Sequence, residues 1–210
     1  MFWEFDNQDH INAAKARFKE SGRGPFYNGE QRWEFNIQNT QLFINAVWQG
    51  YLDMNRTLPQ ITANKNDTVI VNLAKTIQNY FLNHSSEFLH SKWCNDFITG
   101  INAEYLCNAR YGHAQKIVNM AFKYLYCCDG AEEYLDKFNP CHMPLDKYTL
   151  LWLFTETGVL YQGWSYFDEG TYKKVQEDIK RILGSNILGK ELVIWDYFKN
   201  SNWYLGLNGV

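Results

Sequence analysis

The sequence predicts an all-α protein. Apolar residues recur at intervals of three and four over most of the 210 residues, and no run alternates apolar and polar residues as a half-buried strand would. Short segments rich in glycine, proline or polar residues separate these runs. Hydrophobic residues make up 46% of the chain and aromatic residues 17%, enough to bury one substantial core. We therefore expect residues 1–210 to form a single compact helical domain in two lobes that share this core.

The positions of the helices follow from the same periodicity. The first helix covers residues 8–20 and ends at the glycine-rich segment 21–25. Thr40 can cap a second helix. Residues 69–83 begin with β-branched residues, but their apolar spacing fits a helix better than a strand. Further helices are expected near residues 86–108, 112–128, 131–137, 147–157, 169–184 and 188–198.

Composition argues against several classes of protein. No apolar run reaches the roughly 18 residues of a membrane-spanning helix, and the amino-terminal MFWEFDNQDH lacks the features of a signal peptide. We therefore expect a soluble, cytoplasmic protein with no membrane partner. Five cysteines, an odd number, are expected to be reduced thiols. Cys127, Cys128, Cys141 and His142 lack the paired spacing of a zinc site, so we expect no metal and no other cofactor.

The net charge of −3 does not by itself favour nucleic-acid binding, which requires clustered cationic side chains. A local basic patch could nevertheless contact phosphates. The candidate residues for such a patch are Arg110, His113, Lys116 and Lys123.

Lys116 and Asp146 form a candidate catalytic pair. Lys116 lies near the amino end of the helix expected at 112–128, where the helix dipole disfavours a cation and so favours the neutral amine of a nucleophile. Asp146 follows Pro144 and precedes the helix expected at 147–157, a typical N-cap position. Each residue also has a simpler interpretation, with Lys116 as a surface lysine and Asp146 as a cap alone. Together, an amine and an ionised carboxylate favour covalent catalysis.

The segments around this pair resemble the helix-hairpin-helix superfamily of DNA glycosylases, and most closely its archaeal 8-oxoguanine DNA glycosylase branch. The matching motifs are GHAQKIVNMAFKYL, which contains Lys116, and MPLDKYTLLWL, which contains Asp146. The separation of 30 positions between the two residues is similar to that of the archaeal branch. The resemblance covers residues 107–198. It implies a two-lobed fold with a cleft, a catalytic lysine early in the second hairpin helix and a catalytic aspartate that opens a later helix.

The resemblance also implies how DNA would be held. In TYKKVQEDIKRILGSNILGKELVIWDYF, an acidic residue stands four positions before a tryptophan, as in the family's pocket for the damaged base. The residues implied to contact the flipped base are Met120, Pro144, Glu191 and Trp195. The hairpin residues expected to contact DNA are Arg110, Gly112 and His113. The chain departs from the family pattern in having one hairpin glycine instead of two, and in having Glu191 where the family has an aspartate.

The function implied by the resemblance is base-excision repair of DNA by a monomeric glycosylase with AP lyase activity. The substrate would be a flipped, oxidised or otherwise modified purine similar to 8-oxoguanine. Lys116 would attack the sugar C1′ atom as the base departs, while Asp146 stabilises the cationic sugar. The resulting Schiff base could then break the strand by β-elimination.

Two interpretations without catalysis remain open. In the first, the chain is a helical module on the same scaffold that binds nucleic acid or a protein partner, with Lys116 as a phosphate contact. Exposed tryptophans at Trp3, Trp33 and Trp48 would suit such a partner surface. In the second, the chain is a purely structural helical protein, and its aromatic content reflects a bulky core.

Overall fold

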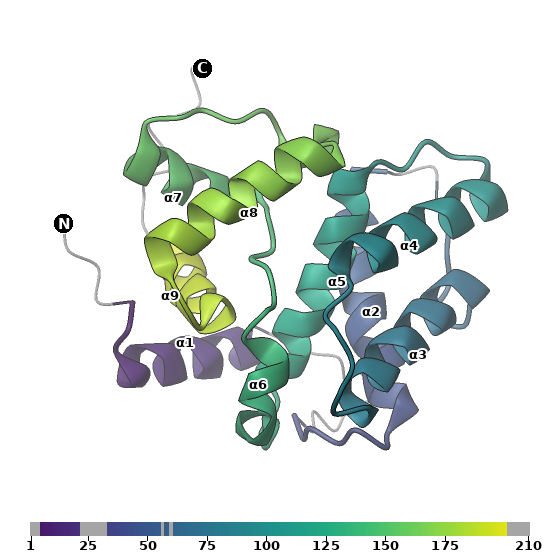
Figure 1. Cartoon of the computed structure of the whole chain (residues 1–210), viewed down its shortest axis with the longest axis horizontal. Helices are drawn as coiled ribbons and strands as arrows, with labels where there is room; N and C mark the ends of the chain where they lie inside the picture. The colour runs from purple at the N-terminus through teal and green to yellow at the C-terminus, as the bar shows by residue number, and fades with distance from the viewer. Residues whose placement is uncertain (1–4, 22–32, 56, 59–60, 201–210) are drawn as a thin grey trace.

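The computed structural model describes residues 5–21, 33–55, 57–58 and 61–200, and within these ranges the protein is all-α (Figure 1). The one β-type pairing in this part of the chain is an isolated bridge between Glu34 and Asp129. The elements in chain order are α1 (Gln8–Glu20), α2 (Thr40–Asn55), α3 (Thr68–Leu82), α4 (His90–Tyr105), α5 (Tyr111–Tyr126), the 3-10 turn η1 (Ala131–Tyr134), α6 (Leu135–Phe138), α7 (Lys147–Thr157), the 3-10 turn η2 (Trp164–Tyr166), α8 (Glu169–Leu183) and α9 (Ile187–Asn200). None of these helices has the length and apolar character needed to cross a bilayer.

Helix α5 lies at the centre of the fold. All 16 of its residues are buried, and it packs against α2, α4, α8 and η2. Figure 1 shows α3 and α4 on one side of α5 and α1, α7 and α9 on the other. The contact with α2 is closest at Gly50, where an added Cβ atom would lie 2.6 Å from the backbone oxygen of Ile117. A glycine is therefore required for the two helices to approach this closely.

The helices around α5 form two groups: α2, α3 and α4 make up the first, and α1, α7, α8 and α9 make up the second. Helix α9 connects the members of the second group. It packs against each of the other three. Arg17 of α1 forms a 2.7 Å ion pair with Asp196 of α9, and the rings of Phe18 and Trp195 meet edge-on with centroids 5.2 Å apart. Since α5 also contacts α8 and η2, its side chains face both groups of helices.

The expected helices are present, with differences that have local causes. The helix expected at 86–108 ends at Tyr105, because Leu106 adopts a left-handed conformation (φ 50°) that cannot continue a right-handed helix. The helix expected at 131–137 is a 3-10 turn followed by a single short helical segment. The turn η2 was not expected from the sequence.

The expectation of exposed tryptophans is wrong for Trp33. Its side chain is 7% exposed and lies edge-on to the ring of Phe18, in the aromatic core. Trp48 is half-buried and stacks on Tyr51 with ring centroids 5.0 Å apart. Trp3 lies outside the described residues. These aromatic rings therefore give no support to a tryptophan-rich partner surface.

The cysteines are free thiols that lie mostly in the core. Cys94, Cys127, Cys128 and Cys141 are buried, and Cys107 is half-buried. Burial raises the pKa of the Cys127 thiol to about 12, so this side chain is uncharged at neutral pH. Within the described ranges, no group of three histidine, cysteine or acidic side chains could hold a metal ion.

Candidate active site

A cavity of about 330 Å³ lies beside α5 and is lined by residues from both groups of helices. Lys116, Met120 and Lys123 reach it from one face of α5, where their spacing of four and three residues places them in a row. Other elements contribute Phe18, Asp53, Asp146, Tyr148, Trp164 and Trp195. The cavity is therefore bounded by aromatic rings and contains several charged groups.

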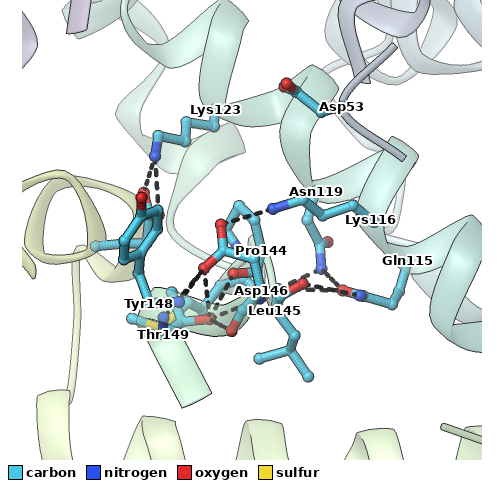
Figure 2. Close-up of polar contacts among 12 residues, drawn as sticks. Asp53, Gln115, Lys116, Asn119, Lys123, Pro144, Leu145, Asp146, Tyr148 and Thr149 are labelled. Carbon is cyan, nitrogen blue, oxygen red and sulfur yellow. Dashed lines mark hydrogen bonds and ion pairs between the residues drawn. The ribbon is translucent and has the colours of Figure 1, made fainter. Parts of the chain in front are cut away.

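Lys116 and Asp146 meet at the wall of this cavity (Figure 2). The Lys116 Nζ atom lies 2.9 Å from the Asp146 Oδ2 atom. The two side chains are only 5% and 21% exposed, so the pair is largely shielded from bulk water. Lys116 lies in the second turn of α5, and Asp146 directly precedes α7. A lysine nucleophile and a carboxylate partner would require this proximity.

The two carboxylate oxygens of Asp146 have different partners. Oδ1 accepts hydrogen bonds from the backbone amides of Tyr148 (2.8 Å) and Thr149 (3.1 Å), which caps α7. In return, the backbone amide of Asp146 donates to Oγ1 of Thr149 (2.8 Å). Oδ2 is left to face Lys116. Capping and pairing are thus carried out by the same side chain, and the simpler interpretation of Asp146 as a cap does not exclude a second role.

The pKa of Asp146 lies below the ordinary value for an aspartate. Burial acts to raise this pKa, but the charge of Lys116 and its hydrogen bond to the carboxylate, assisted by Lys123 and the amide of Thr149, lower it further than burial raises it. Asp146 therefore stays ionised at neutral pH. It places a negative charge beside the amine and beside any cation that forms in the cavity.

Lys123 forms a second, more deeply buried ion pair with Glu191 of α9. The Lys123 Nζ atom lies 2.8 Å from Oε1 and 2.7 Å from Oε2 of Glu191, and the side chains are 2% and 0% exposed. The Lys123 ammonium also lies over the rings of Phe18 (4.6 Å) and Trp195 (5.1 Å). Burial raises the pKa of Glu191, although the charge of Lys123 opposes this shift. Lys123 faces the cavity, whereas Glu191 lies behind it and is not among the lining residues.

From the sequence, Lys123 was expected in a basic patch and not as a residue of the pocket. A signal was present in the spacing, because positions 116 and 123 are seven residues apart and share one face of a helix. Its pairing with Glu191 joins residues 68 positions apart and has no local signal.

The remaining residues expected at the base pocket divide into two kinds. Met120 and the half-buried Trp195 line the cavity, so they lie where contacts with a bound group are available. Pro144 is buried and does not line the cavity; its carbonyl oxygen accepts a hydrogen bond from Oγ1 of Thr149 (3.1 Å). Pro144 therefore helps to hold the backbone that leads to Asp146.

The hairpin residues expected to contact DNA differ in what they present to solvent. Arg110 is exposed and lies over the ring of Tyr166 at 5.2 Å. The amide of Gly112 donates to the carbonyl oxygen of Phe167 (3.0 Å), and an added Cβ atom there would lie 2.0 Å from the carbonyl oxygen of Trp164. The glycine thus allows η2 to pack directly on the start of α5, and its amide is already used within the protein.

His113 has a structural partner at the start of α5. Its Nδ1 atom accepts a hydrogen bond from the backbone amide of Arg110 (2.9 Å). Burial, together with the nearby charge of Arg110, lowers the pKa of His113 to about 4. His113 is therefore neutral at physiological pH, and Arg110 is the residue of these three that offers a positive charge to a phosphate.

In comparisons with known proteins, no family model, curated protein or solved structure matches the chain. The geometry of the cavity and its ion pairs therefore provides the basis for a functional proposal.

Proposed function

We propose that this protein is a DNA glycosylase with AP lyase activity, in which Lys116 is the nucleophile. The observation that carries the proposal is the 2.9 Å contact between Lys116 and Asp146 at the wall of an aromatic cavity. At about 330 Å³, the cavity falls within the range of roughly 300–1,000 Å³ that is typical of pockets for small ligands. One flipped nucleobase is a group of suitable size and chemistry.

The proposed reaction uses the two residues in sequence. Lys116 first passes a proton from its ammonium group to water. Its neutral Nζ atom then attacks the sugar C1′ atom, the bond between C1′ and the base nitrogen breaks, and the base leaves with that electron pair. The negative charge of Asp146 stabilises the positive charge that develops on the sugar. Loss of a proton from the attached nitrogen and opening of the sugar ring give a Schiff base, and β-elimination then breaks the 3′ C–O bond of the strand.

The cavity walls suit recognition of a flat, polar base. Trp195 and Met120 offer apolar surfaces for the two faces of a base, and flipping the base out of the duplex costs about a few kcal/mol, least for a damaged pair. The Lys123 ammonium can donate to a carbonyl oxygen on the edge of the base. A modified purine similar to 8-oxoguanine is therefore the proposed substrate class. The buried Glu191 contributes by holding Lys123 in place.

Duplex DNA is the proposed partner, bound by a monomer inside the cell. Arg110 lies at the amino end of α5, the helix that also carries Lys116, so a phosphate held there would lie close to the proposed nucleophile along the same helix. The acidic net charge predicts weak non-specific binding that falls further as salt is added.

Trapping with borohydride tests the proposal directly. The purified protein is incubated with duplexes that contain 8-oxoguanine, another oxidised purine, an abasic site or no lesion, and borohydride reduces any Schiff base to a stable adduct. We expect an adduct with at least one lesion duplex and none with unmodified DNA. The Lys116→Gln variant should lose this adduct. Lys147→Gln is the matched control, because Lys147 lines the same cavity and should not be needed for the adduct.

Two outcomes would contradict the proposal. An adduct that persists in Lys116→Gln would reject the assignment of the nucleophile. No adduct with any duplex, combined with binding to DNA, would instead favour the noncatalytic module, in which Lys116 serves as a phosphate contact.

A further inference from the structure

The segment from Met143 to Leu145 leads directly into Asp146 and has no regular secondary structure. Met143, Pro144 and Leu145 are all buried, so their backbone polar groups need partners inside the protein. No neighbouring strand is available in this part of the structure. Side-chain amides from α5, which Figure 2 shows, and from α8 supply the missing partners.

Gln176 of α8 binds both backbone groups of Met143. Its Oε1 atom accepts from the Met143 amide (3.1 Å), and its Nε2 atom donates to the Met143 carbonyl oxygen (2.7 Å). Asn119 of α5 adds a third bond, from its Nδ2 atom to the same carbonyl oxygen (3.2 Å). Met143 is thus held as it would be by an adjacent strand.

Gln115 of α5 binds both backbone groups of Leu145 in the same way. Its Oε1 atom accepts from the Leu145 amide and its Nε2 atom donates to the Leu145 carbonyl oxygen, both at 3.4 Å. The side chain of Gln115 is itself held, because Nε2 also donates to the carbonyl oxygen of Gly112 (3.0 Å) and Oε1 accepts from Asn119 (3.0 Å). Gln115 is fully buried and cannot exchange these partners for water.

The contact between Gln115 and the loop is in register with the ion pair of Lys116 and Asp146. Gln115 binds Leu145, and the next residues along both segments, Lys116 and Asp146, bind each other. Consecutive residues of α5 therefore meet consecutive residues of the loop. A shift of the loop backbone by one position would move the Asp146 carboxylate away from the amine.

We propose that Gln115 and Gln176 are positioning residues that set the Asp146 carboxylate against the Lys116 amine. Both act through the backbone of the residues before Asp146, and neither lines the cavity. The catalytic consequence rests on the proposed function, whereas the effect on the ion pair does not. Misplacement of a reacting group by about 1 Å can lower a rate by on the order of 100-fold.

The test replaces each glutamine by methionine, which has a similar length but cannot bind the backbone. Gln78→Met is the matched control, because Gln78 is a buried glutamine that accepts from Thr40 Oγ1 (2.9 Å) and donates to the Ile37 carbonyl oxygen (2.8 Å), away from the cavity. Two quantities are measured on each folded variant. The first is the titration of the Asp146 carboxyl carbon by NMR, and the second is the single-turnover rate of adduct formation with borohydride.

We expect Gln115→Met and Gln176→Met to raise the pKa of Asp146 towards its ordinary value, because the carboxylate moves away from Lys116. We also expect the rate of adduct formation to fall by about 100-fold while DNA affinity changes little. Gln78→Met should lower the unfolding stability to a similar extent without changing either quantity.

The outcomes separate this proposal from the proposed function. If the wild-type protein forms no adduct, the glycosylase proposal fails, but the NMR titration still tests the positioning role. If both variants match Gln78→Met in titration and rate, the positioning role is overturned and the glycosylase proposal stands. Because the two glutamines lie on different helices, one variant can be measured if the other does not fold. Loss of folding in both variants would overturn positioning in favour of a purely structural role.

Discussion

Acidification should destabilise this protein through His113, which is neutral in the folded state. The folded pKa of His113 is about 4, while the ordinary value is 6.5. Between these two values the unfolded chain binds a proton that the folded protein does not, so stability is full above pH 6.5 and is lost as the pH falls towards 4. His113 is only 6% exposed, so solvent screening reduces this effect little.

The expected loss follows from the two pKa values. Between pH 7.5 and pH 5.5, a histidine with these values lowers the free energy of unfolding by about 1.3 kcal/mol. His113→Gln is the matched variant, because glutamine does not titrate and can still accept the hydrogen bond from the amide of Arg110. The variant should therefore lose about 1.3 kcal/mol less than the wild-type protein over this range.

Urea unfolding followed by tryptophan fluorescence at the two pH values measures this difference. Other groups also titrate: His142, whose pKa is about 4, acts in the same direction, and Glu191, whose pKa is raised, acts in the opposite direction. Their contributions are common to both proteins and cancel in the comparison. An equal pH dependence in the wild-type protein and His113→Gln would contradict this prediction, since His113 would then be protonated alike in the folded and unfolded states.

Three further predictions concern the ion pairs and the packing of α5. Asp146→Asn should retain the α7 cap and lose the borohydride adduct, and an adduct of normal yield in this variant would contradict the role of the carboxylate. Asp146→Ala should in addition lose about 1 kcal/mol of stability in urea. Gly50→Ala should lower the free energy of unfolding by about 1–3 kcal/mol, because the added Cβ atom would lie 2.6 Å from the Ile117 carbonyl oxygen. An unchanged melting temperature in thermal unfolding would argue against so close a helix contact. Lys123→Met should lower the free energy of unfolding by about 3 kcal/mol, because it leaves Glu191 buried without its partner. Adding Glu191→Gln should recover most of that loss. A single variant of unchanged stability would show that the pair contributes little.

The helices could be predicted from the sequence because their signals are local. The helix expected at 147–157 is observed as Lys147–Thr157, with Asp146 as its N-cap and Gly158 in the left-handed conformation after its end. Each of these signals acts within a few residues of the helix end. The turn η2 was missed because it is only three residues long and is held by Gly112 of α5, which is distant in the chain.

The helical class follows from the sequence alone, as do the chemical types of the candidate pair: an amine near a helix start and a carboxylate at an N-cap. Which of these groups meet depends on the packed fold. It brought Lys116 to Asp146 across 30 positions and buried Lys123 against Glu191 across 68. It also left His113 neutral in the first turn of α5. These contacts have no local signal, because burial and ion pairing depend on segments far apart in the chain, whose approach is set by the packing of the whole core.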